Sequence, residues 1–175
     1  HQQRLRSLWA KTTTTGPSVF HPVTFHMVDT ANVAKQLLSP AVPARIRLAF
    51  GSAFSELPSD YVIMWLPLVV ALHDLGKISS PFQRQNDGQR TRLEGLGFSL
   101  SDALLADSVR HQHFSAVAIR DDVLPLVPQF ANIEQVLVGA LAGHHGAFPN
   151  SGTLGKARKF SRQSETDEIK ALRQE

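Results

Sequence analysis

The residues best suited to chemistry in this sequence are the adjacent pair His73 and Asp74, which close an apolar stretch, with Lys77 one helical turn further on. Imidazole and carboxylate groups bind transition-metal ions, and the absence of cysteine from all 175 residues excludes thiolate sites. Helical neighbours diverge by about 100 degrees, so His73 can bind one ion while the Asp74 carboxylate bridges two. Lys77 shares their face. The alternative is an internal ion pair between Asp74 and Lys77, with His73 as a cap.

Further histidines stand at the edges of other apolar segments. They are His26, His111, His113 and the consecutive pair in Gly143-His144-His145-Gly146, where flanking glycines let the backbone turn so that both imidazoles can converge on one ion. A lone histidine in such a place is more often a hydrogen-bonded core residue than a ligand. Their combination with the His-Asp pair predicts a metal centre.

Hydrophobic periodicity predicts the helices that must position these side chains. We expect helices over residues 24–38 with His26, 43–50, 61–75 with His73 and Asp74 at its end, 101–120 with His111 and His113, and 133–142 before His144. Residues 83–92 are almost wholly polar and predict an exposed loop. No convincing strand-like alternation occurs. With 42% hydrophobic and 19% charged residues, the sequence predicts a globular all-α domain with a metal site between helices.

The formal net charge of +3 is too small to identify a partner, but one local cluster stands out. It comprises Lys156, Arg158, Lys159 and Arg162 around Phe160, with no acid among them. Such a cluster is typical of a surface that follows a phosphate backbone, but it is more often an ordinary solvated helix face.

The longest apolar run, residues 65–72, holds eight residues, far short of the roughly 20 that a membrane-spanning helix needs. The polar, basic first residues are not followed by the apolar core of a signal peptide. We therefore expect a cytoplasmic protein with no membrane partner. The sequence contains no P-loop motif, and we therefore expect no ATPase site of its own.

The sequence resembles the HD nuclease domain of the CRISPR type I nuclease-helicase, the effector recruited to the Cascade R-loop. The resemblance covers residues 8–148 and runs through Leu8-Trp9-Ala10-Lys11, His21 to Ala31, Ala71 to Lys77 with Phe82-Gln83, Arg110-His111 with Ser115-Ala116, and Gly143 to Gly146. Gaps of 47, 38 and 33 residues separate His26, His73, His111 and His144. It implies an all-α HD-domain helical bundle.

The resemblance also implies a set of metal ligands. It makes His26, His73 and Asp74 ligands of one ion, and Asp74, His111, His144 and His145 ligands of the other. Asp74 and Lys77 are then the catalytic candidates, with Lys77 facing the scissile phosphate or a developing charge.

Two positions in this assignment need a choice. His113 is a rival to His111, but Arg110 before His111 and Ser115 four residues after it match the family better. The family's first ion also takes a distal aspartate, and Asp167, the sole aspartate after His145, lies in a charged polar stretch that does not suit a ligand. We therefore expect residues 1–175 to form a single HD-type nuclease domain truncated before its last helices.

The function implied is hydrolysis of phosphodiesters in single-stranded DNA, the displaced strand of an R-loop, by two divalent metal ions. Imidazole-rich ligand sets suit Mn, Fe, Co or Ni, and also Zn, better than Mg. The implied partners are a helicase, fused or separate, and the Cascade complex. Two alternatives stay open: an HD phosphohydrolase that acts on a small nucleotide, and a catalytically incomplete docking module.

Overall fold

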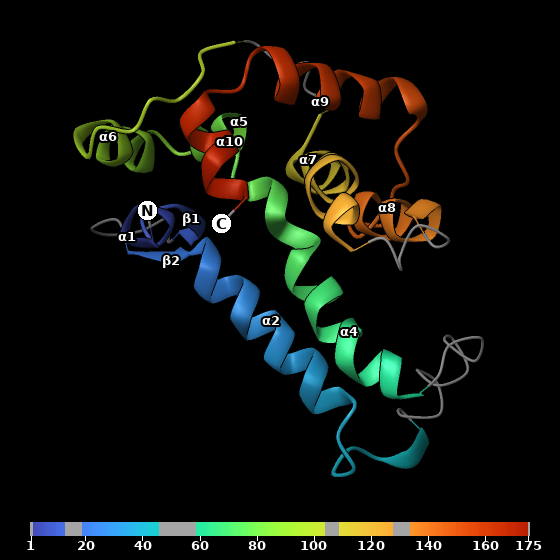
Figure 1. Ribbon diagram of the computed structural model, residues 1–175. Helices are drawn as coiled ribbons and strands as arrows, with labels where there is room; N and C mark the ends of the chain where they lie inside the picture. Colours follow the sequence, from blue (N-terminus) through green and yellow to red (C-terminus); the bar gives the residue numbers. More distant parts are fainter. Residues whose placement is uncertain (1, 13–18, 46–58, 104–108, 128–133, 175) are drawn as a thin grey trace.

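The computed structural model describes residues 2–12, 19–45, 59–103, 109–127 and 134–174, and these are mostly helical (Figure 1). In chain order the elements are α1 (Gln2–Leu5), β1 (Trp9–Thr12), β2 (Phe20–Pro22), α2 (Val23–Leu37), α4 (Ser59–Ala71), the 3-10 segment η1 (Leu72–Lys77), α5 (Ser80–Gln83), α6 (Asp87–Gly95), α7 (His111–Ala118), the π-helical η2 (Ile119–Val123), the 3-10 segment η3 (Leu124–Leu126), α8 (Glu134–Ala142), α9 (Ser151–Gln163) and α10 (Asp167–Arg173).

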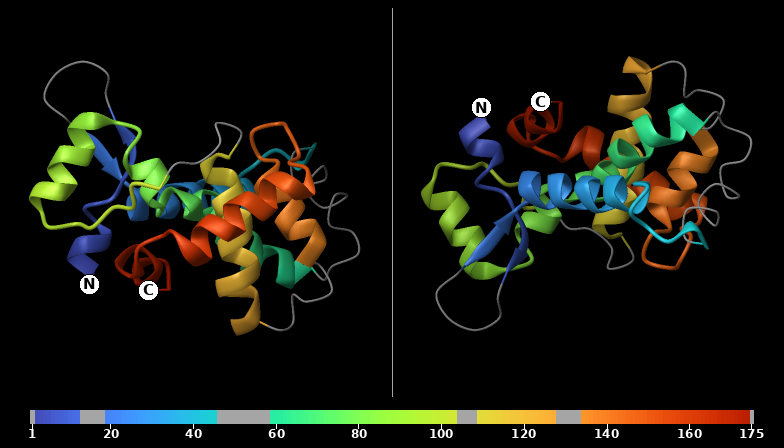
Figure 2. Two further views of the ribbon diagram at one scale, coloured as in Figure 1. Left: turned by 90° about the horizontal axis from the view of Figure 1, so that it is seen from above. Right: turned by 90° about the horizontal axis from the view of Figure 1, so that it is seen from below.

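Helices α2 and α4 lie side by side, and η1 carries the chain from α4 into the centre of the domain, where it packs against α7. Figures 1 and 2 show the β-hairpin and α6 at one end of the domain and α7, α8 and α9 at the other. The site therefore forms where η1 passes between the two ends. The expected helix over residues 24–38 is confirmed by α2.

Most of the expected helix 61–75 is present as α4, but the α-helix ends at Ala71 and the chain tightens into 3-10 geometry over Leu72–Lys77. The His-Asp pair and Lys77 all lie in this tighter segment. A 3-10 turn has three residues rather than 3.6, so residues three apart, such as Asp74 and Lys77, are closely aligned.

The sequence-based expectation of no strands is wrong. β1 and β2 form an antiparallel pair in which Trp9 opposes Pro22 and Thr12 opposes Phe20, with an irregularity between Trp9 and Lys11. The strands have only four and three residues, too few for an alternating pattern to emerge.

The expected exposed loop over residues 83–92 is also wrong. Gln83 ends α5, and α6 begins after Asn86, whose side chain accepts a hydrogen bond of 2.9 Å from the backbone N–H of Gln89. Gln83 and Gln89 are fully buried. A polar stretch can be buried when its side chains find hydrogen-bond partners, which hydrophobicity alone does not reveal.

Two other expected helices differ in extent. In the helix expected over residues 101–120, residues 101–103 and 109–110 are not helical, and residues 104–108 lie outside the described part of the chain. Helix α7 begins at His111, and its continuation is the π-helical η2. The helix expected over residues 133–142 is present as α8, and residue 133 lies outside the described residues. Most of the segment expected as a helix over 43–50 also lies outside them.

The main hydrophobic core joins both ends of the domain through η1. Its buried side chains include Leu8 and Trp9 near the N-terminus, Leu75 in η1, Ile119 in η2 and Ile169 in α10. A second cluster, formed by Phe114, Val117, Ala157 and Phe160, fixes α9 against α7. Within the described residues, no helix combines the length and apolarity needed to cross a membrane.

Candidate metal centre

Asp74 lies at the centre of a cluster of histidines, and its two carboxylate oxygens face different members. Oδ2 is 2.8 Å from Nε2 of His26 and 3.1 Å from Nε2 of His73. Oδ1 is 3.2 Å from Nε2 of His111 and 3.7 Å from Nε2 of His144. Only 3% of Asp74 is exposed, so the carboxylate is out of bulk water and surrounded by imidazoles.

The expected ligands come together in two groups, each with its ligand atoms within 4.8 Å of one another. One group is His26, His73 and Asp74, and the other is His111, His144 and His145. Nε2 of His145 lies 3.0 Å from Nε2 of His111. These are the candidate residues named from the sequence, and they come from α2, η1, α7 and the turn that follows α8.

Two of the imidazoles are oriented by backbone carbonyls. Nδ1 of His73 donates to the carbonyl of Val70 and Nδ1 of His144 donates to the carbonyl of Leu141, each at 2.6 Å. A ring that donates through Nδ1 presents the lone pair of Nε2, and this backbone support is common behind metal-binding histidines. Both Nε2 atoms accordingly point toward Asp74.

The donor set fits a cation. Asp74 Oδ1 and His144 Nε2 are both buried and have no hydrogen-bond partner among the described residues. A buried carboxylate oxygen and a buried imidazole nitrogen without partners are costly unless a metal ion takes up their lone pairs. The combination of imidazole nitrogens with one shared carboxylate suits transition-metal ions.

Lys77 closes the side of Asp74 that faces β1. Its Nζ lies 2.8 Å from Asp74 Oδ2 and donates to the carbonyl of Ala10 at 3.3 Å, and only 8% of the residue is exposed. The internal ion pair considered from the sequence is therefore present. It does not exclude a role toward a phosphate, since an ammonium carries three donors.

The electrostatics favour ligation. Burial opposes ionisation of Asp74, but its interactions with His111, His73 and Lys77 outweigh that cost and hold the pKa of Asp74 well below its usual range. Burial and the charge of Lys77 lower the pKa of His26, and burial likewise lowers the pKa of His144. The structure thus favours an ionised Asp74 and neutral His26 and His144, the protonation states that metal binding requires.

The pKa of His73 shifts in the opposite direction to those of His26 and His144. Burial lowers its pKa, but the hydrogen bond and the charge of Asp74 more than compensate, so the pKa of His73 is raised. Proton and metal ion would compete for its Nε2.

The choice between His111 and His113 is clear in the structure. His111 faces Asp74, whereas His113 is 5% exposed and its Nδ1 accepts a hydrogen bond of 3.0 Å from the backbone N–H of Arg110. Burial lowers the pKa of His113, consistent with a neutral core residue. His113 therefore supports the start of α7 and lies outside both ligand groups.

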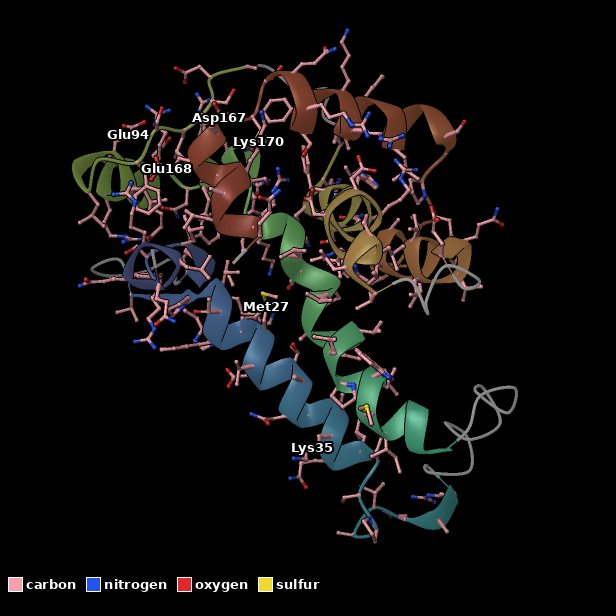
Figure 3. All side chains as sticks on the ribbon, viewed as in Figure 1. Met27, Lys35, Glu94, Asp167, Glu168 and Lys170 are labelled. Carbon is pink, nitrogen blue, oxygen red and sulfur yellow. The ribbon has the colours of Figure 1, made fainter. Side chains whose placement is uncertain are left out.

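Asp167 is not part of the centre. It begins α10, where its fully exposed side chain pairs with Lys170 at 3.3 Å (Figure 3). An acidic residue in the first turn of a helix is stabilised by the helix dipole, which accounts for its position. Among the described residues, no later aspartate joins His26, His73 and Asp74.

One contact that aligns the centre was not recognised from the sequence, although its residues belong to the motifs quoted above. The backbone N–H of Gly76 donates to Ser115 Oγ at 2.8 Å, and Ser115 Oγ donates to the carbonyl of His111 at 3.3 Å. A Cβ at position 76 would lie 1.9 Å from the carbonyl oxygen of His111. Only glycine allows η1 and α7 to approach so closely.

A helical domain in which an adjacent histidine and aspartate meet further histidines from neighbouring helices is an HD-type domain. The family described as Cas3, HD domain, matches residues 9–175, and the chain belongs to this family. The resemblance seen in the sequence is thereby confirmed.

Individual relatives agree with this assignment. The chain is 32% identical over 157 residues to the CRISPR-associated endonuclease/helicase Cas3 of Thermus thermophilus, covering 89% of this chain and 16% of the relative. A solved CRISPR-associated protein superposes with a TM-score of 0.72 at 25% identity, over 97% of this chain and 18% of that one. The Thermus thermophilus Cas3 HD domain, crystallised in the presence of Ni²⁺, gives a TM-score of 0.58 at 29% identity, over 96% of this chain and 60% of that domain.

Proposed function

We propose that this domain is a metal-dependent nuclease that hydrolyses phosphodiester bonds of single-stranded DNA in type I CRISPR interference, acting on the displaced strand of an R-loop. The name of the Thermus relative, an endonuclease/helicase, supports the nuclease activity and a helicase partner. The chain spans only 16% of that relative. We therefore also propose, rather than conclude, that it works with a helicase in cis or in trans and with the Cascade complex, in the cytoplasm.

The main support for the proposal is that the two oxygens of the Asp74 carboxylate face different groups of histidines. Oδ2 faces His26 and His73, whereas Oδ1 faces His111 and His144. One carboxylate shared by two groups of imidazoles is the arrangement that holds two ions close together. His26 and His73 would hold one ion and His111, His144 and His145 the other, with Asp74 common to both.

Two such ions would supply Lewis-acid stabilisation of phosphate charge and a more acidic water. The imidazole-rich donor set favours Mn, Fe, Co or Ni, with Zn also suited, over Mg. The crystallisation of a similar Cas3 HD domain in the presence of Ni²⁺ supports a divalent transition metal.

The protein's own groups have distinct tasks in this scheme. Asp74 stays ionised and sets the separation of the two ligand groups. Lys77 restrains Asp74 through their 2.8 Å contact and carries a positive charge toward which a phosphate is attracted. The Val70 and Leu141 carbonyls keep the rings of His73 and His144 turned inward.

The exposure of the ligands favours a polymer over an enclosed small nucleotide. His145 is exposed, and His73, His111 and His144 are each partly exposed, so the cluster opens to solvent. The cavity among α4, η2, η3 and α8 is lined wholly by aliphatic side chains, including Leu68 and Leu141, and contains none of the candidate ligands. It offers no polar group to orient a nucleotide.

The test is metal-dependent cleavage by the purified chain. The protein is stripped with a chelator, reloaded with Mn²⁺, Co²⁺ or Ni²⁺, and incubated with circular single-stranded DNA without ATP. We expect cleavage by the wild type and none by Asp74→Asn, because both ligand groups lose the charge that they share. Asp102→Asn removes an exposed carboxylate outside the centre and should leave cleavage unchanged. Wild-type turnover by Asp74→Asn would show that the centre is misassigned.

A further inference from the structure

A cluster of basic side chains lies on α9, outside the metal centre. We name it the α9 basic face and define it as Lys156, Arg158, Lys159 and Arg162 of α9 with Arg120 of η2. We propose that this face binds the sugar–phosphate backbone of a nucleic-acid single strand and holds it beside the metal centre. The proposal deepens the nuclease function proposed above and rests on it for the identity of the bound polymer.

A single carboxylate organises the arginines of this face. Asp121 Oδ2 lies 2.9 Å from Nε of Arg158 and 3.1 Å from a terminal nitrogen of Arg162, and Oδ1 lies 3.3 Å from Nε of Arg120. Burial tends to raise the pKa of Asp121, but Arg158 and its neighbours outweigh burial and lower it, so the carboxylate stays ionised. Three guanidinium groups are thus gathered around one negative charge.

These guanidinium groups keep donors for a ligand. Each has five N–H donors in a planar fork, and the contacts with Asp121 use only part of them. The side chain of Arg158 is 40% exposed and that of Arg162 is 59% exposed. Because Asp121 already restricts their motion, a phosphate that binds there orders fewer side-chain rotamers than it would on free arginines.

The face also carries a large excess of positive charge. Lys156 and Lys159 are exposed and pair with no acid among the described residues, and α9 itself contains no acidic residue. The five basic side chains of the α9 basic face have two acidic neighbours, Asp121 and Asp122, so three positive charges remain in excess. This equals the formal net charge of the whole chain, +3, so the remaining charges balance one another. Local rather than total charge attracts a polyanion.

The kind of recognition follows from Phe160. The ring is 4% exposed and packs edge-on against Phe114, with 5.7 Å between the ring centroids, so it cannot stack on a base. The groups that this face offers to a strand are ammonium and guanidinium groups, so we expect it to bind chiefly through phosphates. Phosphate contacts carry no sequence information and depend strongly on salt.

The position of the face relative to the centre makes it useful for a nuclease. Helix α9 is fixed against α7 by the Phe114–Phe160 contact, and α7 begins at the candidate ligand His111. Asp121 follows ten residues later, which corresponds to about 15 Å along a helix. Helix α9 lies beside α7 (Figure 1), so a strand bound to the α9 basic face would be held about the length of α7 from the metal centre.

The experiment measures binding of a fluorescein-labelled oligo-dT strand by fluorescence anisotropy, with a chelator present and over a series of salt concentrations. The test variant is Lys156→Gln/Lys159→Gln, whose two side chains are exposed, so the fold is not at risk. The matched control is Lys35→Gln/Arg45→Gln, which makes the same charge change at two exposed positions, with Lys35 near the far end of α2 (Figure 3).

Each phosphate contact on a single strand contributes about 0.7 to the slope of log affinity against log salt concentration. We expect the α9 variant to lose about 1.4 from the wild-type slope and the control to keep the slope unchanged. Equal slopes for the α9 variant and the wild type, or the same loss in the control, would overturn the proposal.

Failure of this proposal can be separated from failure of the nuclease function. Asp74→Asn should bind the strand like the wild type in chelator while cleaving none of it after metal loading. If metal-loaded wild type fails to cleave but the slopes differ as expected, strand binding stands and the nuclease function falls. If cleavage occurs and the slopes do not differ, only the α9 basic face is refuted.

Discussion

Gln83 and Trp9 are joined by three hydrogen bonds although 74 positions separate them in the sequence. Gln83 Oε1 accepts from the backbone N–H of Trp9 at 3.1 Å, Gln83 Nε2 donates to the carbonyl of Trp9 at 2.9 Å, and the indole N–H of Trp9 donates to the carbonyl of Gln83 at 3.2 Å. Gln83 Nε2 also donates to the carbonyl of Lys77 at 2.8 Å. Gln83 thus ties β1 to the segment that carries Asp74 and Lys77.

Gln83→Met should weaken metal binding as well as stability. The substitution keeps the approximate size of the side chain but leaves the Trp9 N–H and the Lys77 carbonyl without partners, at a cost of about 1–3 kcal/mol in the free energy of unfolding. Gln89→Met is the control, because Gln89 is equally buried but its side-chain Oε1 accepts a hydrogen bond from Arg92 within α6. Denaturant unfolding should show that both variants are less stable than the wild type. Isothermal titration should show that only Gln83→Met binds Mn²⁺ more weakly. Equal metal affinity in the two would limit Gln83 to a structural role.

Lys77→Ala should slow hydrolysis and leave the metal content nearly intact. An ammonium cannot ligate a metal ion, and loss of one group that stabilises developing charge costs about 10²–10³ in turnover. Turnover of single-stranded DNA and metal content by mass spectrometry give the two readouts. Loss of bound metal in this variant would instead make Lys77 chiefly the structural partner of Asp74.

His145→Ala and His113→Ala should have opposite effects. His145 is exposed at the end of α8, so its removal should lower metal affinity while changing the melting temperature little. His113 is buried and accepts a hydrogen bond at the start of α7, so its removal should lower stability by about 1–3 kcal/mol and leave metal affinity unchanged. Thermal unfolding and metal titration of the metal-free proteins distinguish these results. A reversed pattern would make His145 a core residue and His113 the ligand.

The two ligand groups should bind metal with unequal affinity. The group around Oδ2 has His26, His73 and Asp74, whereas the other has His111, His144 and His145 together with Asp74. A titration with Co²⁺ followed by absorption should therefore show a tight and a weak step, and Asp74→Asn should remove both. A single step with two equivalent ions would mean that a further protein ligand completes the weaker site.

The clustering of the candidate histidine and aspartate ligands could be predicted because their residue types and positions near helix ends are visible in the sequence. Choosing His111 over His113 required the family resemblance, since both occur in the same helix. The roles of Gln83 and Gln89 could not be predicted, because a buried glutamine differs from an exposed one only in partners that are remote in the sequence. The strands at Trp9–Thr12 and Phe20–Pro22 were missed because their pairing, not their hydrophobic pattern, defines them.

Because Gly76 contacts the backbone of α7, position 76 has no room for any side chain. The groups that a side chain would meet are the carbonyl of His111 and the backbone of Ser115, which cannot rotate aside as a flexible side chain can. Even alanine would force apart the two segments that carry Asp74 and His111. Evolution therefore has no graded path through slightly larger residues here. The spacing between the segments that carry Asp74 and His111 is therefore set by main-chain packing at Gly76.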